Sequence, residues 1–438
     1  MSNGNGNVDV FVENITRVEG HGNIKVRASD GKLEECQLQI TESPRYYEQM
    51  LLGRKWYDAV HITCRICGIC STGHTCSSLQ GMERAMGIEP SEQTHKLREL
   101  GLMGETLQSH YLHVYFLVAP DLLGVPSVVP LAETHTDVVK MALRQKRLAN
   151  DICCVTGGRH IHPLSMRVNG FTSFPTKEEL AGLKERLIAS RDDLQATVEL
   201  LLTLADKLPA FERECEYVAL TNPPRYEFYS GKIGSTVTEP VEPNDYKSKV
   251  IETTVPHSHA KFCGSDGKPY QVGALARFNL NHEYLKPEAK EVAKTLGMPG
   301  PSTNPYFINI AQVVECVETT EYAVELIDHF LDVGFDPEQD GHRDVKPQAG
   351  RGTGAVEVPR GILFHEYEVD DEGTIVDANL IIPTGQNLAN VEADFEALVP
   401  TILDKEHKEI ELLLEMLVRA YDPCISCATH LLNVEWID

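Results

Sequence analysis

Two stretches at opposite ends of the chain decide its fold: Arg65-Ile66-Cys67-Gly68-Ile69-Cys70-Ser71-Thr72-Gly73-His74 and Asp422-Pro423-Cys424-Ile425-Ser426-Cys427-Ala428-Thr429-His430. Each is a Cys-x-x-Cys pair followed by a histidine. Together the pairs supply four thiolates, enough for a closed tetrahedral metal site or a sulfur-bridged cluster. A small zinc ribbon closes its loop within about 15–20 residues, whereas about 350 residues separate these pairs. The fold must therefore bring both ends of the chain together in its interior, with the metal site at its centre.

The composition indicates a large globular protein and excludes several classes of function. The chain has 438 residues, of which 42% are hydrophobic, and this is ample for a sizeable core. Its formal net charge of −25 argues against nucleic acid as a partner, since phosphate binding requires clustered Lys and Arg. The sequence has no run of about 18 apolar residues, and its polar start, residues 1–7, does not resemble a secretory signal. We expect a cytoplasmic protein without direct membrane insertion.

Apolar alternation and helical periodicity predict the elements of the chain. Residues 8–42 alternate as strands do, with a hairpin at Asp30-Gly31. A second hairpin is expected over 362–382, and residues 336–354, which lack periodicity, predict an exposed loop. Helical spacing is found over residues 92–118, 134–156, 177–208, 310–331 and 387–421, and the last of these helices is expected to end at Asp422-Pro423.

No internal repeat or flexible linker divides the sequence. Length alone suggests about three ordinary domains, but we prefer one continuous domain over residues 1–438. The expected fold class is mainly α, a multihelical body with long central helices and small peripheral β-sheets. The second cysteine pair follows the end of a long helix, which is a rigid place to mount ligands.

The twelve cysteines do not all require a functional explanation. In a long chain without an export signal, metal binding or catalysis is favoured over disulfides. A buried free cysteine otherwise behaves as a small hydrophobe. This plain interpretation suits six of them: Cys36, Cys153, Cys154, Cys215, Cys263 and Cys316.

Three interpretations of the clustered cysteines compete. The first is a structural zinc site that uses both pairs. The second is an iron–sulfur cluster in the N-terminal segment, where Cys64 precedes the first pair; the next cysteine, Cys76, stands too far along for the usual ferredoxin spacing. The third is a catalytic metal site that combines both pairs. The fixed cations Arg65 and Arg360 and nearby carboxylates favour the third interpretation, because a structural zinc site does not require such a setting.

The motifs around the pairs resemble those of the large, catalytic subunit of [NiFe] hydrogenases. Both cysteine motifs match that family, and further segments match in the same order along nearly the whole chain. Residues 42–48 and 422–427 look most like the cytosolic, cofactor-linked (group 3-like) enzymes. The further matching segments are Arg17-Val18-Glu19-Gly20-His21, Gly157-Gly158-Arg159-His160-Ile161-His162-Pro163, Val358-Pro359-Arg360-Gly361 and Ile382-Pro383-Thr384.

The resemblance implies reversible, heterolytic cleavage of H2 at a nickel–iron centre. Cys67 and Cys424 would be terminal nickel ligands, and Cys70 and Cys427 would bridge to iron, which in this family carries one CO and two CN ligands. Soft thiolates suit such metals better than carboxylates do. The alternative function is a non-catalytic, zinc-stapled helical scaffold of an electron-transfer complex.

The resemblance also assigns roles around the four cysteines. Cys424 would accept the proton, and Glu19 would be the first carboxylate of the proton relay. Arg360 would lie beside the diatomic ligands, with Asp121 and Asp422 flanking it and fixing its orientation. Three further residues are expected close around the centre: His74, Pro383 and Thr384, of which Thr384 would donate a hydrogen bond to a cyanide.

A second metal ion is implied near the C-terminal end of the chain. Glu48, His430 and the backbone carbonyl of Leu380 are similar to the ligands of a magnesium-type divalent ion in the family. Carboxylate, carbonyl and water oxygens suit such a hard cation.

The resemblance implies partners as well. Beyond the site cysteines the sequence has no spaced cysteine set to carry electrons outward, so we expect an iron–sulfur small subunit. A flavin-, NAD(P)- or other cofactor-binding subunit would pass electrons on to a soluble acceptor. In the family, a maturation endopeptidase removes a C-terminal extension from many precursors, and here the tail would be residues 431–438.

Overall fold

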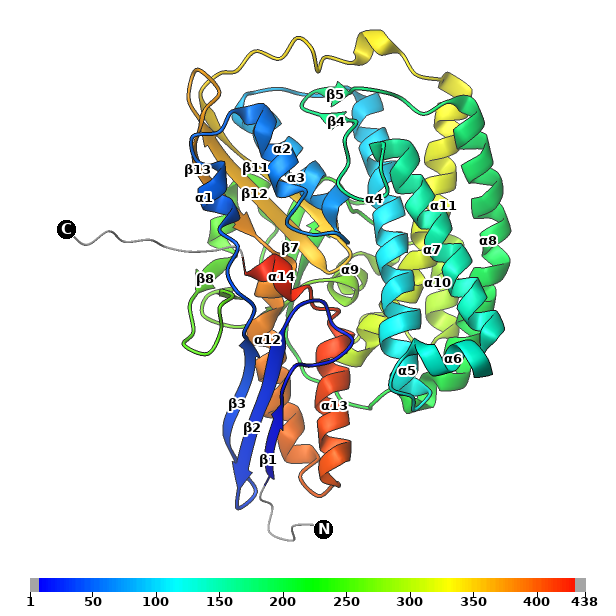
Figure 1. Cartoon of the computed structure of the whole chain (residues 1–438), viewed down its shortest axis with the longest axis vertical. Coiled ribbons are helices and arrows are strands. Elements are labelled where there is room, and N and C mark those ends of the chain that lie inside the picture. Colours follow the sequence, from blue (N-terminus) through cyan, green and yellow to red (C-terminus); the bar gives the residue numbers. More distant parts are fainter. Residues whose placement is uncertain (1–7, 430–438) are drawn as a thin grey trace, which may run out of the picture.

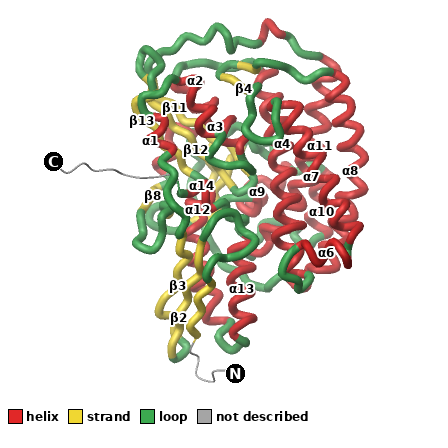
Figure 2. The backbone as a smooth tube through the Cα atoms, viewed as in Figure 1, coloured by secondary structure: helices red, strands yellow, loops and turns green. Residues whose placement is uncertain are grey.

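Long helices form one side of the molecule, and small sheets with shorter helices form the other (Figures 1 and 2). The computed structural model describes residues 8–429. Helices predominate, as expected. In the described part of the chain, no helix is long and apolar enough to cross a membrane.

The long helices confirm four of the predicted helical segments. Helices α4 (Glu92–Leu112) and α8 (Lys177–Leu204) both pack against α7 (Thr136–Gly157) and α11 (Ile308–Val333). Helix α8 begins with a capping box, in which Thr176 and Glu179 each bond the other's backbone N–H. A π-helical stretch (His113–Val118) continues α4, and the shorter helices on this side are α5 (Ala119–Leu122), α6 (Val128–Thr134), α9 (Ala274–Asn281) and α10 (Pro287–Thr295).

The N-terminal segment forms strands joined by a hairpin, as predicted, and the strands pair as an antiparallel sheet in the order β1-β2-β3. Its strands are β1 (Val8–Val12), β2 (Gly22–Ser29) and β3 (Lys32–Ile40). The hairpin between β2 and β3 turns at Asp30 and Gly31, whose φ angles of 48° and 73° are those of a tight hairpin turn. Alternate residues such as Val10, Ile24 and Val26 are buried, because one face of the sheet packs on later helices.

A second antiparallel sheet, β11 (Gly350–Val358), β12 (Gly361–Val369) and β13 (Ile375–Ile381), contains the second predicted hairpin. The expected loop over 336–354 is wrong from residue 350 onward, where β11 begins. Nor is this sheet peripheral, because β12 is buried over almost its whole length and helix α3 (Ser71–Ala85) packs on β11 and β12. Glycines make the close packing possible: a Cβ at Gly81 would lie 2.5 Å from the carbonyl oxygen of His365.

The predicted helix over 387–421 is in fact two helices. Helix α12 (Pro383–Leu398) ends in a 3₁₀ turn (Val399–Thr401), and α13 (His407–Ala420) begins after a short connection. Pro400 lies in that turn, lacks a backbone N–H and restricts the residue before it, so a continuous helix is broken there. The second helix ends just before Asp422-Pro423, as expected.

The remaining strands are short and lie in the mixed, turn-rich part of the sequence or beside α7. Strand β6 (Glu216–Thr221) pairs with β7 (Lys232–Ser235) and β10 (Tyr270–Gln271), β4 (Met166–Arg167) pairs with β5 (Gly170–Phe171), and β8 (Ile251–Thr253) pairs with β9 (Phe262–Gly264).

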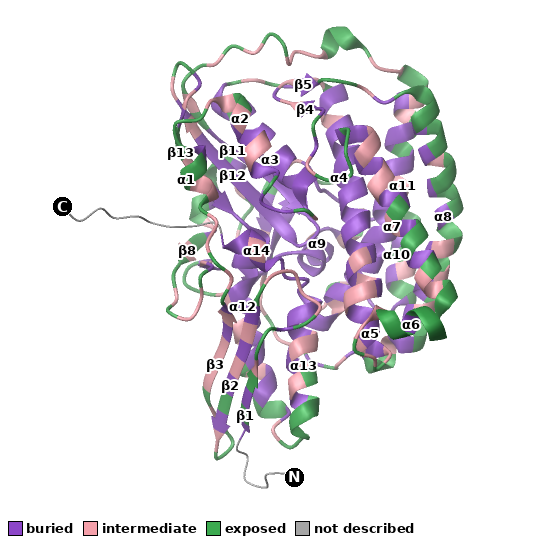
Figure 3. Ribbon diagram, viewed as in Figure 1, coloured by how far each residue is buried: buried purple, intermediate pink, exposed green. Residues whose placement is uncertain are grey.

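Buried residues run through the middle of the molecule, from the sheets into the long helices (Figure 3). One cluster of buried apolar side chains includes residues from Val8 to Ala428, and a smaller one lies around β6 and β12. The prediction of a single domain stays a prediction.

Three short helices complete the sheet side: α1 (Tyr47–Leu51), α2 (Trp56–Thr63) and α14 (Ile425–Ala428).

Candidate metal centre

The two cysteine loops meet inside the molecule. The first loop connects α2 with α3, and Cys70 immediately precedes α3. The second loop leaves α13 and enters α14, which lies near the centre of the view in Figure 1. Asp422, at a left-handed φ of 50°, turns the chain into Pro423, so that Cys424 and Cys427 face the first pair. The convergence expected from the sequence is present.

The four sulfur atoms form one buried cluster. The Sγ atoms of Cys67 and Cys424 are 3.5 Å apart, and those of Cys70 and Cys427 are 4.0 Å apart. None of the four residues is more than 5% exposed. In the described part of the chain, two groups of potential metal ligands share Cys427: one adds Cys67 and Cys424, and the other adds Cys70 and His74.

The electrostatics of the cluster allow four thiolates together only if a cation binds between them. Hydrogen bonds from the thiols of Cys424, Cys427 and Cys70 hold the pKa of Cys67 well below its usual range. Burial raises the pKa of Cys427 well above its usual range. One thiolate is therefore stabilised by its neighbours, but four thiolates buried together would repel each other unless positive charge lay between them. Soft metal ions supply that charge, so the donor set fits a thiolate-bound metal centre.

Arg360 places a buried guanidinium beside the cysteines. It donates from Nε to the carbonyl oxygen of Asp422 at 2.6 Å, from Nη2 to Oδ1 of Asp422 at 2.8 Å, and from Nη1 to the hydroxyl of Ser109 at 3.3 Å. Burial lowers the pKa of Arg360, but the Asp422 carboxylate and the cysteine sulfurs outweigh it, and the net pKa shift is upward. Arg360 is therefore a cation held by Asp422, one of the two acids that the resemblance places beside it.

The predicted role of Asp121 differs from its contacts. We expected this acid to flank Arg360, but its carboxylate bonds two other arginines. Its Oδ2 accepts from Nε of Arg419 at 2.6 Å, its Oδ1 accepts from Nη2 of Arg419 at 3.0 Å, and Arg17 also pairs with it. Asp121 thus joins the N-terminal loop, which carries Glu19, to the end of α13. We call Arg17, Asp121 and Arg419 the arginine clamp.

Glu19 reaches the second cysteine loop. Its backbone carbonyl accepts from the N–H of Ile425 at 2.9 Å, and its Oε2 accepts from the N–H of Ser426 at 3.0 Å. Gly20 permits this approach: it has a φ of +89°, and a Cβ there would lie 2.6 Å from the Cβ of Ile425. Glu19 is thus fixed against the residues between Cys424 and Cys427.

Thr384 and Pro383 begin α12 directly beside Cys424. The hydroxyl oxygen of Thr384 accepts from the backbone N–H of Cys424 at 2.9 Å, which orients the hydroxyl proton elsewhere. Pro383 occupies the first turn of the helix, where its missing N–H costs no hydrogen bond. Both residues are buried.

His74 lies in a buried chain of polar groups behind Cys70. Its Nδ1 is 3.0 Å from Nε2 of His365, whose Nδ1 is 3.0 Å from the hydroxyl of Tyr367. That hydroxyl contacts the hydroxyl of Ser78 at 2.9 Å. The interpretation of His74 as a residue close around the centre agrees with this position.

Part of the second predicted metal site is within the described chain. Oε1 of Glu48, in α1, accepts from the backbone N–H of Leu380 at 2.8 Å, which brings two of the three expected ligand residues together. His430 and the tail lie outside the described residues. The magnesium-type site stays a prediction.

Three polar residues hold the loops in place but received no role from the sequence. Arg45 donates to the carbonyl oxygens of Ile66 and Ser426, one in each cysteine loop. Glu105 accepts from the N–H groups of Thr72 and Gly73 at 2.5 and 2.9 Å and so caps the start of α3. Glu42 accepts from the hydroxyl of Ser426 at 2.9 Å. A charge within the apolar run of α4 could have indicated Glu105, but nothing local to the other two indicates their partners.

Cys64 and Cys76 do not join the cluster. The thiol of Cys64 lies 3.5 Å from the carbonyl oxygen of His61, and burial raises its pKa. Cys76 is fully buried in α3, where burial also raises its pKa. In the described residues neither belongs to a metal-ligating group, so the second interpretation, an N-terminal iron–sulfur cluster, is disfavoured.

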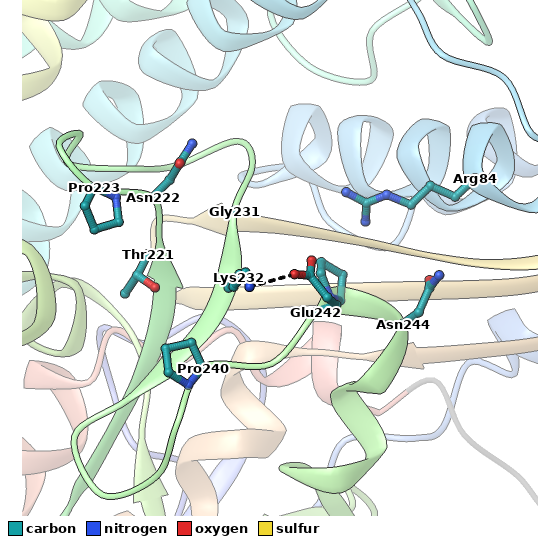
Figure 4. Close-up of a pocket in the computed structure, with 10 residues that line it drawn as sticks. Arg84, Thr221, Asn222, Pro223, Gly231, Lys232, Pro240, Glu242 and Asn244 are labelled. Atoms are coloured by element: carbon teal, nitrogen blue, oxygen red, sulfur yellow. Dashed lines mark ion pairs between the residues drawn. The ribbon is translucent and has the colours of Figure 1, made fainter.

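One surface cavity of about 650 Å³ lies beside β6 and β7 (Figure 4). None of the four site cysteines lines it. Lys232 and Glu242 in its wall form an ion pair of 3.0 Å with each other, and Arg84 donates to the carbonyl of Thr353. Because these charges already have partners, we assign no ligand to the cavity.

Comparison with known proteins identifies the family. The family model described as nickel-dependent hydrogenase matches residues 45–141 and 213–430, which contain both cysteine pairs, and a model described as HoxL-like matches residues 9–43. The alpha chain of sulfhydrogenase 2 of Pyrococcus furiosus is 31% identical over 97% of this chain and 100% of its own length. A chain of the F420-non-reducing hydrogenase of Methanothermobacter marburgensis is 30% identical over 97% of this chain and 95% of its own.

A solved structure agrees with these relatives. The structure described as an NAD+-reducing [NiFe]-hydrogenase in the H2-reduced state superposes with a TM-score of 0.87 and 27% identity, over 97% of this chain and 99% of that one. The match extends over the body of the chain as well as the cysteine motifs, and it does not favour the zinc-scaffold alternative. The chain therefore belongs to the nickel-dependent hydrogenase family, as a catalytic large subunit.

Proposed function

We propose that this subunit cleaves H2 reversibly at a nickel–iron centre held by Cys67, Cys70, Cys424 and Cys427. The observation that carries the proposal is the buried cluster of four sulfurs, built from both ends of the chain. Two overlapping groups of potential metal ligands in the described residues share Cys427. When bound, the nickel–iron pair with its CO and CN ligands would supply the electron-accepting chemistry that divides H2 into hydride and proton.

The residues of the chain would manage the proton and the polar ligands. Cys424 would take the proton, because its sulfur belongs to the cluster and its loop is in direct contact with Glu19. Glu19 would carry the proton away from the site. Arg360, oriented by Asp422, and Thr384, anchored on Cys424, would offer donors to the diatomic ligands.

The remaining features of the proposal follow the relatives. A magnesium-type ion would be held by Glu48, Leu380 and His430. An iron–sulfur small subunit would take the electrons, and a flavin-, NAD(P)- or other cofactor-binding subunit would pass them to a soluble acceptor.

The names of the relatives include sulfhydrogenases, F420-non-reducing enzymes and an NAD+-reducing enzyme, all consistent with a cytoplasmic complex. A maturation endopeptidase would act on residues 431–438 in a precursor.

Metal analysis and infrared spectroscopy of the purified complex test the proposal. We expect about one nickel and one iron per large subunit, with infrared bands of iron-bound CO and CN. One zinc without diatomic bands would instead support the scaffold alternative and refute the proposal.

The substitution Cys424→Ser tests the role of the thiolate. It removes a soft ligand and the proton acceptor together, so H2 turnover and isotope exchange should both be lost. Cys154→Ser, at a partly exposed thiol of α7 outside the cluster, is the matched control and should leave turnover unchanged. Substantial exchange by the Cys424→Ser variant would remove Cys424 from the mechanism.

A further inference from the structure

A line of polar contacts connects the second cysteine loop with the protein surface. Ser426 stands in that loop, and its N–H donates to Glu19 while its hydroxyl donates to Oε1 of Glu42 at 2.9 Å. Oε2 of Glu42 accepts from the backbone N–H of His21 at 3.0 Å and lies 3.0 Å from Nδ1 of the His21 ring. The His21 side chain is 71% exposed, whereas that of Glu42 is 20% exposed.

The two carboxylates therefore meet at a single serine. Glu19 accepts from the backbone N–H of Ser426 and Glu42 accepts from its hydroxyl, so both carboxylates bond the same residue. Glu42 belongs to the segment 42–48, to which the proposed reaction gives no role apart from the metal ligand Glu48.

The surroundings of Glu42 favour its charged carboxylate form. Burial raises its pKa, but hydrogen bonds from His21 and Ser426 outweigh burial and lower the pKa overall. The ring of His259 contacts the Glu42 carbonyl oxygen at 3.0 Å, and no charged group other than the His21 ring bonds its carboxylate in the described residues. Glu42 is thus a carboxylate near neutral pH with one exposed titratable neighbour.

We propose that Glu42 and His21 form the outer half of the proton path of this subunit, and that the Ser426 hydroxyl links them to Glu19. The inference rests on the proposed function, because it requires that Glu19 receive the proton from the centre. It adds a defined exit on this chain itself, independent of any partner subunit.

Each transfer conserves protons and moves no electrons between groups. The O–H bond of protonated Glu19 breaks as a bond forms to Oγ of Ser426, while the existing Oγ–H bond breaks and the proton joins Oε1 of Glu42. Glu19 returns to a carboxylate, Ser426 stays neutral and Glu42 becomes a carboxylic acid. Glu42 then passes the proton to the His21 ring, and the exposed ring releases a proton to water.

The substitution Glu42→Gln separates proton transfer from loop architecture. The amide oxygen of Gln still accepts from Ser426, while its N–H₂ group faces the backbone N–H of His21; Gln cannot carry a proton at ordinary pH. Two assays on the purified complex divide the reaction. Conversion of para-H2 to ortho-H2 requires only cleavage and recombination at the centre, whereas HD formation from D2 in H2O also requires exchange with solvent protons.

We expect Glu42→Gln to lower H2 oxidation and HD formation by about tenfold or more, with para–ortho conversion and the infrared bands as in the wild type. Glu42→Asp keeps a carboxylate and should recover part of the loss. His21→Ala should lower turnover in dilute buffer and be rescued by added imidazole. Glu13→Gln, at an exposed position of the same β1–β2 loop, is the matched control and should change none of these rates.

Two results would overturn the inference, and a third would overturn the proposed function. If the Glu42→Gln variant formed HD at the rate of the wild type, the proton path would run elsewhere. If the variant lost both para–ortho conversion and HD formation and its infrared bands shifted, Glu42 would have only a structural role. A wild-type complex that fails in both assays would instead refute the nickel–iron centre itself.

Discussion

The substitution Asp121→Asn distinguishes a structural role for Asp121 from a catalytic one. The arginine clamp is buried: the side chains of Asp121 and Arg419 are 3% and 1% exposed, and that of Arg17 is 13% exposed. Asparagine has nearly the same shape, but it loses the charge and turns an N–H₂ group toward guanidinium donors. The variant therefore leaves Arg419 with a buried charge and a weaker partner.

The expected magnitude follows from burial. Breaking a buried ion pair by removing one partner costs about 3–5 kcal/mol of the free energy of unfolding. The entropy of unfolding is about 2.1 cal/mol/K per residue, or about 0.9 kcal/mol/K for a chain of this length. If the chain unfolds as one unit, the melting temperature should fall by about 3–5 °C.

Differential scanning calorimetry of the purified complex measures this change. The matched control is Asp193→Asn, because Asp193 also binds one arginine through both oxygens, but that arginine, Arg144, is 61% exposed. An exposed pair contributes about 0–1 kcal/mol, so the control should shift the melting temperature by about 1 °C or less. If Asp121→Asn abolished turnover at an unchanged melting temperature, the clamp interpretation would be refuted and a direct role at the centre restored.

Three further outcomes are expected. Gly354→Ala places a methyl group against the backbone of α3 at Ser77, and such overpacking should lower stability by about 1–3 kcal/mol; an unchanged calorimetric transition would contradict the packing of β11 on that helix. Burial raises the pKa of Glu315, but Arg277 outweighs burial and brings the pKa down to about 2, below its unfolded value of 4.5. The carboxylate therefore contributes about 3 kcal/mol to the free energy of unfolding. This contribution is fully present above pH 4.5 and is lost as the pH falls through 2. Unfolding of Glu315→Gln and wild type followed from pH 5 to pH 2 checks this, and equal slopes would argue against it. Finally, the intact mass of the active, nickel-loaded subunit should lack residues 431–438; a mass that includes them would show that the tail is retained.

Local sequence was sufficient for elements whose own side chains specify them. Alternation predicted β1 to β3, and periodicity predicted α8 and α11, because burial of one face imposes a regular spacing on each element. It failed for β11, where Gly350, Gly352 and Gly354 read as a loop. Those glycines are explained only by the backbone of α3 lying against the strand. Pro400 was a local signal that the prediction of one helix over 387–421 overlooked.

For the candidate site, the sequence by itself determined which donor atoms exist and how each pair is spaced. Two Cys-x-x-Cys motifs identify soft ligands, and their separation requires that the ends of the chain meet. Only the tertiary structure decided the partners: Asp422 rather than Asp121 on Arg360, Arg45 across both loops, and Glu42 on Ser426. The physical reason is that these contacts join residues distant along the chain. A side chain's type limits what it can bind, but the packing of helices and sheets selects which of several equivalent partners comes within hydrogen-bonding distance.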